Sequence, residues 1–148
     1  MDIKKLRKQL EIDEGVKYEI YLDHLGYPTF GIGHLILKTD PEYGQPVGTK
    51  VSQERVYDAF NDDICNVLND CVKLYIDFYV LPEEAQQIIA NMMFNLGYTR
   101  LSKFKNMKKA VEEGNWKEAA NQMVESRWYG QVGMRSRRLV ERMRVIGG

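Results

Sequence analysis

The sequence predicts an α+β fold in which a small N-terminal lobe with a β-hairpin is joined by a long helix to a larger helical lobe. Apolar residues alternate with polar ones only between residues 16 and 34, and they recur at helical spacing over most of the remaining chain. A length of 148 residues suits one domain that buries about two-thirds of its unfolded surface. We therefore expect a single domain, residues 1–148, with lobes at about 13–55 and at 1–12 plus 75–148, and a connecting helix at about 52–74.

The N-terminal third is expected to contain one short helix and two strands. Asp2 can cap the helix and Gly15 can end it. From residue 16 to 22 the apolar period changes to two, which indicates a strand, and residues 29–34 are expected to return as its partner after a turn at residues 25–28. Segment 40–48 is rich in Pro and Gly and should be an irregular loop. The apolar residues on one face of the helix are Ile3, Leu6 and Leu10.

The chain after residue 50 is expected to be helical. Ser52 can cap the long connecting helix, and Pro82 suits the first turn of a buried central helix. Glycines separate the shorter helices that follow. After the connecting helix, we expect helices at 82–97, 102–113, 115–129 and 134–146.

Composition and charge exclude several functional classes. The chain has 21 Lys plus Arg against 21 Asp plus Glu, which removes an overall field able to hold nucleic acid or an anionic membrane. No stretch is apolar enough for membrane insertion, and the first residues lack the apolar region of a secretory signal, so we expect the chain to be made in a cytoplasm. Cys65 and Cys71 lie on the predicted long helix about 9 Å apart, beyond the about 7 Å that a disulfide tolerates. We expect reduced cysteines, no metal, no cofactor and a monomer.

Glu14 is the first candidate for chemistry. It follows Leu10 by four residues, so it extends the apolar face of the first helix and should be half-buried. Burial and the negative end of the helix dipole both favour the protonated carboxyl that a general acid needs at neutral pH. An ordinary surface glutamate at a frayed helix end is the alternative that position alone leaves open.

Asp23 and Thr29 are the next candidates. Asp23 ends the first predicted strand and Thr29 begins the second, so the turn between them can hold the two side chains close together. Together they could orient a water molecule. Taken singly, an aspartate beside a turn is more often a turn-former, and a strand threonine usually reflects β propensity.

Several separated motifs, in the same order, resemble those of the phage T4-type lysozymes. The spacing E-x8-D-x5-T from Glu14 through Asp23 to Thr29 matches that family's catalytic triad. The resemblance implies a lysozyme-like fold and an endolysin, or muramidase, that hydrolyses the β-1,4 bond between N-acetylmuramic acid and N-acetylglucosamine in peptidoglycan. The motifs are Asp13-Glu14-Gly15, Tyr21-Leu22-Asp23, the hairpin 26–34, Asn91 to Gly97, and Ser126-Arg127-Trp128-Tyr129.

Transferred residue by residue, the resemblance implies Glu14 as the acid, with Asp23 and Thr29 holding the attacking water. A threonine without an adjacent base is a poor nucleophile, so we expect a single-displacement, inverting reaction. The resemblance also implies a structural ion pair of His34 with Asp63. The family usually has glutamine at Asn95, and Arg135 matches an arginine that approaches the catalytic glutamate. The expected substrate-binding residues are Gly33, Leu35, Asn95, Phe104, Asn106 and Arg135.

Two rival functions remain at this point. A lytic transglycosylase needs the glutamate but no aspartate that positions water, so Asp23 argues against it. A non-catalytic wall-binding relative would have lost the acid, so the joint presence of Glu14, Asp23 and Thr29 argues against it. The expected partner is the peptidoglycan glycan strand, which the protein would reach through a holin-type pore or after lysis.

Overall fold

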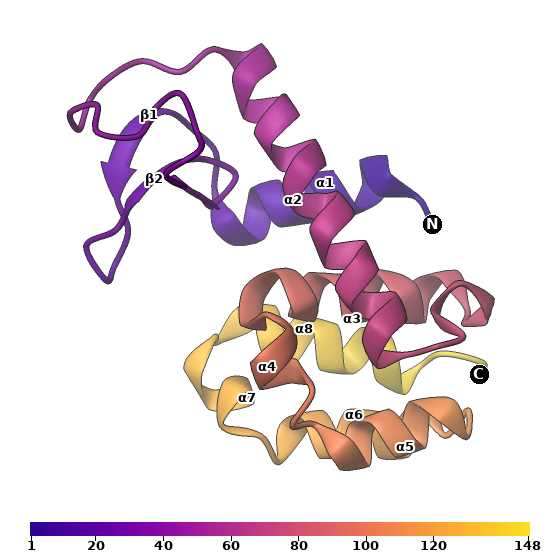
Figure 1. Cartoon of the computed structure of the whole chain (residues 1–148). Coiled ribbons are helices and arrows are strands. Elements are labelled where there is room, and N and C mark those ends of the chain that lie inside the picture. The colour runs from indigo at the N-terminus through magenta and orange to yellow at the C-terminus, as the bar shows by residue number, and fades with distance from the viewer. The chain divides into compact units, whose positions relative to one another are not determined.

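The computed structural model describes residues 1–148 as eight α-helices, one 3-10 helix and a three-stranded antiparallel sheet (Figure 1). The predicted α+β class is confirmed. The chain forms two compact units, residues 7–66 and residues 1–6 with 67–148. No helix combines the length and the apolar character needed to cross a membrane.

The unit of residues 7–66 contains the sheet. Its elements are most of α1 (Ile3–Glu14), β1 (Lys17–Leu22), β2 (Pro28–Gly31), β3 (His34–Leu35) and the first part of α2 (Gln53–Leu74). Apolar side chains from the helices and from one face of the sheet form its core. The most deeply buried of these are Leu10, Ile20, Phe30, Ile32, Val56 and Phe60.

Helices α1 and α2 begin as the sequence predicts. The Asp2 carboxylate accepts the Lys5 N–H at 3.0 Å, and the Ser52 hydroxyl accepts the Arg55 N–H at 3.1 Å. Each cap satisfies a backbone donor that the first turn of a helix leaves unpaired. Gly15, with φ of +77°, follows the last residue of α1 and allows the chain to leave the helix.

The returning strand predicted at 29–34 is wrong as a single element. The chain reverses after Gly31 and forms a third strand, in which Phe30 pairs with His34. Gly31 and Gly33 have φ of +65° and +62°, a backbone conformation that residues with a Cβ rarely adopt. Gly31 and Gly33 are therefore the residues that turn the chain between β2 and β3.

The alternation predicted for the first strand is only partly correct. Ile20 is fully buried, but Tyr18 and Leu22 are 43% and 53% exposed. The pairing of β1 with β2 is irregular between Lys17 and Tyr21. On its other edge β1 is covered by the chain before α2, where the Ile20 N–H donates to the Thr49 carbonyl at 2.9 Å. In this small sheet only the side chain in the middle of β1, Ile20, is buried in the core, and the side chains nearer its ends stay exposed.

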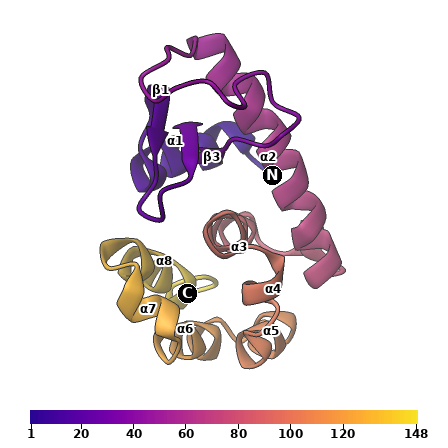
Figure 2. The ribbon, with the colours of Figure 1, turned by 60° about the vertical axis from the view of Figure 1, so that its left-hand side comes forward.

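The unit formed by residues 1–6 and 67–148 is built around α3. This helix is buried almost all round, and α4 and α8 pack against it (Figure 2). Cys65 and Cys71 on α2 form no disulfide, as predicted. The elements after α2 are η1 (Phe78–Val80), α3 (Glu83–Leu96), α4 (Tyr98–Leu101), α5 (Lys105–Glu112), α6 (Trp116–Val124), α7 (Arg127–Gln131) and α8 (Met134–Arg144).

Two of the later predicted helices need correction. The helix expected at 102–113 begins only at Lys105, because residues 102–104 form the turn that follows the separate short helix α4. The helix expected at 115–129 is two helices, α6 and α7. The Ser126 hydroxyl donates to the Met123 carbonyl at 2.6 Å and accepts the Tyr129 N–H, so one side chain ends α6 and caps α7.

Candidate active site

Thr29 lies in the middle of a row of side chains that crosses all three strands. It pairs with Tyr21 on β1 and with Leu35 on β3. Directly paired residues of neighbouring antiparallel strands project from the same face of the sheet. The opposite face carries Ile20 and Phe30 into the core. Thr29 is therefore flanked by Tyr21 and Leu35 on the face that points away from the core.

Asp23 and Thr29 are joined through the backbone of Tyr27. The Asp23 Oδ1 accepts the N–H groups of Leu25 and Tyr27, both at 2.9 Å. The Tyr27 carbonyl in turn accepts the Asp23 N–H and the Thr29 hydroxyl, again at 2.9 Å each. Asp23 is thus a turn-former, and its second oxygen, Oδ2, is left without a hydrogen-bond partner in the protein.

Glu14 is the last residue of α1, and Gly33 lies directly against it. A Cβ added to Gly33 would lie 2.9 Å from the Glu14 Oε1 and 3.4 Å from the Glu14 Cβ. Burial, followed by the negative charges of Glu14 and Asp23, raises the pKa of Tyr21. Both carboxylates therefore lie within electrostatic reach of the Tyr21 phenol.

Asn95 and Phe104, both predicted to bind substrate, are connected by Trp128 in the other unit. The Asn95 side-chain carbonyl accepts the Trp128 indole N–H at 2.8 Å. The Phe104 ring packs edge-on against the Trp128 ring at 6.4 Å between centroids. Trp128 is buried. The Asn95 carbonyl thus holds the tryptophan, and its amide N–H groups are not used in this contact.

Surface hollows lie on two sides of Phe104. One, of about 510 Å³, is lined by Phe104 and Asn106 together with Gln122 and Ser126. The other, of about 390 Å³, includes Phe104 and Trp128. The sequence did not indicate that Gln122, on α6, or Ser126, the cap of α7, would line a hollow, since an isolated polar residue has no pattern that distinguishes such a position from simple solvent exposure. The packing of α5 against α6 brings them to the predicted residues.

Arg135 is anchored within the same unit. It is only 9% exposed, and its Nε donates to the Asn91 side-chain carbonyl at 2.9 Å. A second guanidinium nitrogen donates to the Asn91 backbone carbonyl at 3.3 Å. Asn91 itself is fully buried on α3. The start of α8 is therefore held to α3 by a buried charged group.

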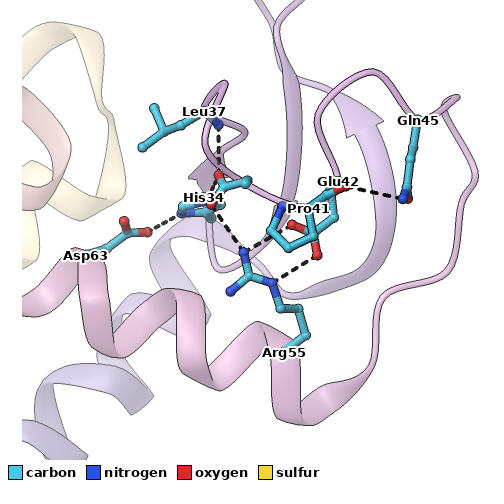
Figure 3. Close-up of polar contacts among 8 residues, drawn as sticks. His34, Leu37, Pro41, Glu42, Gln45, Arg55 and Asp63 are labelled. Atoms are coloured by element: carbon cyan, nitrogen blue, oxygen red, sulfur yellow. Dashed lines mark hydrogen bonds and ion pairs between the residues drawn. The ribbon is translucent and has the colours of Figure 1, made fainter.

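The ion pair expected between His34 and Asp63 is present, and it belongs to a larger cluster (Figure 3). The His34 Nδ1 lies 2.7 Å from Asp63, and Nε2 lies 2.8 Å from Asp40, which the sequence did not indicate. The Arg55 guanidinium forms ion pairs with both Asp40, at 3.2 Å, and Glu42, at 2.9 Å. Burial opposes charge on His34, but the two carboxylates outweigh it and raise its pKa.

Comparison with known proteins adds independent evidence. The family model described as Phage lysozyme matches residues 11–144. The chain is 30% identical to probable T4-type lysozyme 2 of Dictyostelium discoideum, over 93% of this chain and 92% of the relative. It is 28% identical to the pre-baseplate central spike protein Gp5 of Enterobacteria phage T4, over 90% of this chain and 26% of the relative. It is 30% identical to the peptidoglycan hydrolase gp36 of Pseudomonas phage phiKMV, over 96% of this chain and 15% of the relative.

The fold and these matches define the class of protein as a glycoside hydrolase with the lysozyme-like α+β architecture. The chain belongs to the phage lysozyme family.

Proposed function

We propose that the protein is an endolysin that hydrolyses the β-1,4 bond between N-acetylmuramic acid and N-acetylglucosamine in bacterial peptidoglycan. Glu14 protonates the leaving oxygen, and Asp23 and Thr29 hold the attacking water. The observation that carries this proposal is the hydrogen-bonded turn in which the Tyr27 backbone joins Asp23 to Thr29. One relative is a peptidoglycan hydrolase by name, which supports the choice of substrate.

The hydrogen bonds of the turn suit a water site. The Thr29 hydroxyl donates its proton to the Tyr27 carbonyl, so its lone pairs remain available to accept a hydrogen from water. The Asp23 Oδ2 offers a second acceptor, while Oδ1 is held by two backbone amides. A water that donates one hydrogen to each residue has its own lone pair directed outward, toward an anomeric carbon.

The same geometry favours a single displacement with inversion. Thr29 has its proton committed to a carbonyl, which is not a base, so it is not activated as a nucleophile. Asp23 acts as the base that takes a proton from the water as the bond breaks. In inverting enzymes the two carboxyl groups stand about 6.5–9.5 Å apart so that water fits between them.

The remaining predicted residues are proposed to bind the glycan. Gly33 and Leu35 lie beside Glu14 and Thr29, while Asn95, Phe104 and Asn106 gather at Trp128 and the hollow of about 510 Å³. Arg135 is proposed as a further residue that binds the glycan. We propose that the protein reaches the wall through a holin-type pore or after lysis.

Replacement of Glu14 by glutamine tests the acid. We expect Glu14→Gln to lose at least a hundredfold in the rate of clearing a suspension of bacterial walls, because general acid catalysis contributes about 10²–10⁴-fold. The thermal midpoint should change little, because the amide keeps the shape of the carboxyl. Activity within tenfold of wild type would contradict the assignment.

The anomeric form of the product tests the mechanism. A defined β-linked muropeptide oligomer is hydrolysed and followed by proton NMR before mutarotation. We expect the α-anomer of N-acetylmuramic acid first. An initial β-anomer would indicate a covalent intermediate on Asp23, and a 1,6-anhydro product would identify a lytic transglycosylase.

A further inference from the structure

Tyr21 has no part in the reaction described so far, yet it pairs with Thr29 of the proposed catalytic group and lies close to Asp23 in the chain. It is the cross-strand partner of Thr29 and lies two residues before Asp23. Glu14 and Asp23 both act on its phenol electrostatically. No other aromatic side chain pairs with Thr29 in the sheet.

The row across the sheet gives Tyr21 a definite place in the site. Thr29 lies between Tyr21 and Leu35, and neighbouring strands are about 4.8 Å apart. Thr29 itself is only 4% exposed, so a sugar that reaches this face of the sheet would meet the side chains of Tyr21 and Leu35 beside it. Aromatic rings and aliphatic side chains both offer the apolar surface that the C–H faces of a sugar require.

One further contact and one surface hollow describe the surroundings of the Tyr21 ring. The Lys17 ammonium lies 4.3 Å from the centroid of the Tyr21 ring, a cation–π contact on one ring face. Tyr21 also lines a surface hollow of about 550 Å³ along β1, so part of its surface faces open space. The hydroxyl remains protonated near neutral pH, because burial and the two carboxylates raise its pKa, and it can donate a hydrogen bond.

We infer that Tyr21 is a substrate-contacting residue, whose ring forms the wall of the site opposite Leu35 and packs against the sugar whose bond is cleaved. This inference rests on the function proposed above. It assigns to Tyr21 a role in glycan binding, whereas the transfer of the proton and the direction of the water remain with Glu14, Asp23 and Thr29.

The test separates binding from chemistry. In the active enzyme, Tyr21→Leu should lower kcat/KM about tenfold, mainly through KM, because it removes the ring contact. Tyr21→Phe keeps the ring and should stay within about threefold of wild type. In the Glu14→Gln background, calorimetric affinity for a muropeptide tetrasaccharide should fall about tenfold when Tyr21→Leu is added. Tyr43→Leu, at an exposed tyrosine in the loop 40–48, should leave affinity and kcat/KM unchanged.

A second measurement avoids any loss of folding. The full chain, labelled with 3-fluorotyrosine at its nine tyrosines, is titrated with the tetrasaccharide and followed by fluorine NMR, with Tyr21→Phe identifying the Tyr21 signal. The Tyr21 signal should shift and the Tyr43 signal should not. A stationary Tyr21 signal at saturation, or wild-type affinity in folded Tyr21→Leu, would overturn the inference. Persistent wall lysis by Glu14→Gln would instead overturn the proposed function.

Discussion

Gly33 shows how tightly one residue can be constrained by a neighbouring side chain. Its φ of +62° already disfavours any residue with a Cβ, and Gly15 shares this constraint with φ of +77°. Only at Gly33 would the added carbon also meet Glu14, at 2.9 Å from Oε1, whereas nothing lies within 4 Å of a Cβ at Gly15. A comparison of alanine variants at the two positions therefore distinguishes the effect of backbone strain from the effect of a collision with Glu14.

We expect Gly33→Ala to lower wall lysis at least tenfold, because the Glu14 carboxyl must move aside. Both Gly33→Ala and Gly15→Ala should lose about 1–2 kcal/mol of unfolding free energy from the left-handed backbone alone. Only Gly33→Ala should lose activity per folded molecule. Turbidity assays beside denaturant titrations measure both, and equal activities of the two variants would refute the proposed collision.

Asp23 has two roles that substitutions can separate. Asp23→Asn keeps a carbonyl oxygen for the Leu25 and Tyr27 amides but removes the charge that takes a proton from water. We expect it to unfold at nearly the wild-type temperature and to lose at least a hundredfold in activity. Asp23→Ala should lose activity equally and should also lose stability. Normal lysis of walls by folded Asp23→Ala would make Asp23 a turn residue only.

At the scale of elements, the sequence predicted best where the signal is local. The caps at Asp2 and Ser52 and the stop at Gly15 lie next to the helices that they bound, so their positions are visible in the sequence. The strand 29–34 and the helix 115–129 were wrong because glycine conformation and a hydrogen bond of Ser126 decide them. The same residues are compatible with an uninterrupted element.

The cap on α2 can be tested by itself. Ser52→Ala removes the acceptor for the Arg55 N–H and should lower the free energy of unfolding by about 1 kcal/mol. Ser52→Asp supplies another acceptor and should restore most of this loss. Specific activity per folded molecule should not change in either variant. Equal thermal midpoints for Ser52→Ala and wild type would show that the cap adds nothing to stability.

At the scale of the whole molecule, each of the two units brings together candidate residues that are separated in the chain. The local spacing of Glu14, Asp23 and Thr29 matched a known pattern, so these residues could be selected from the sequence. Tyr21 could not, because its pairing with Thr29 depends on an irregular register within β1. Gln122 reaches the hollow beside Phe104 only through the packing of separate helices. Residues that become neighbours only through tertiary packing have no characteristic spacing in the sequence, so the sequence alone does not predict them.

The charges around His34 illustrate the same limit and control stability against pH. Asp63 was expected, whereas Asp40 and the Arg55–Glu42 pair depend on the path of an irregular loop. Burial alone would raise the pKa of Asp40, but hydrogen bonds from the Leu37 N–H and from His34, together with the charge of Arg55, lower it. The hydrogen bond from Arg55 lowers the pKa of Glu42. The cluster ties the loop 40–48 to α2.

The pH dependence of stability follows from these directions. The pKa of His34 is raised above 6.5, so its contribution is complete below that value and is lost as pH rises through the raised pKa. The lowered pKa values of Asp40 and Glu42 give contributions that are present above about pH 4.5 and are lost as pH falls through the lowered values. The cluster should therefore stabilise the protein most between about pH 4.5 and 6.5.

We expect His34→Asn to lower the free energy of unfolding most within this window, and the difference from wild type to shrink as pH rises above the raised pKa of His34. Catalysis should survive, because the His34 imidazole is bonded to Asp63 and Asp40, and neither carboxylate is among the residues proposed to act on the substrate. Denaturant titrations from pH 4 to 9 measure the difference. The matched control is His24→Asn, since His24 is the other histidine and is exposed on the turn, and its difference from wild type should stay flat. A His34→Asn difference that grows steadily from acid to alkaline pH would show that the neutral imidazole, and not the charged one, is the stabilising form.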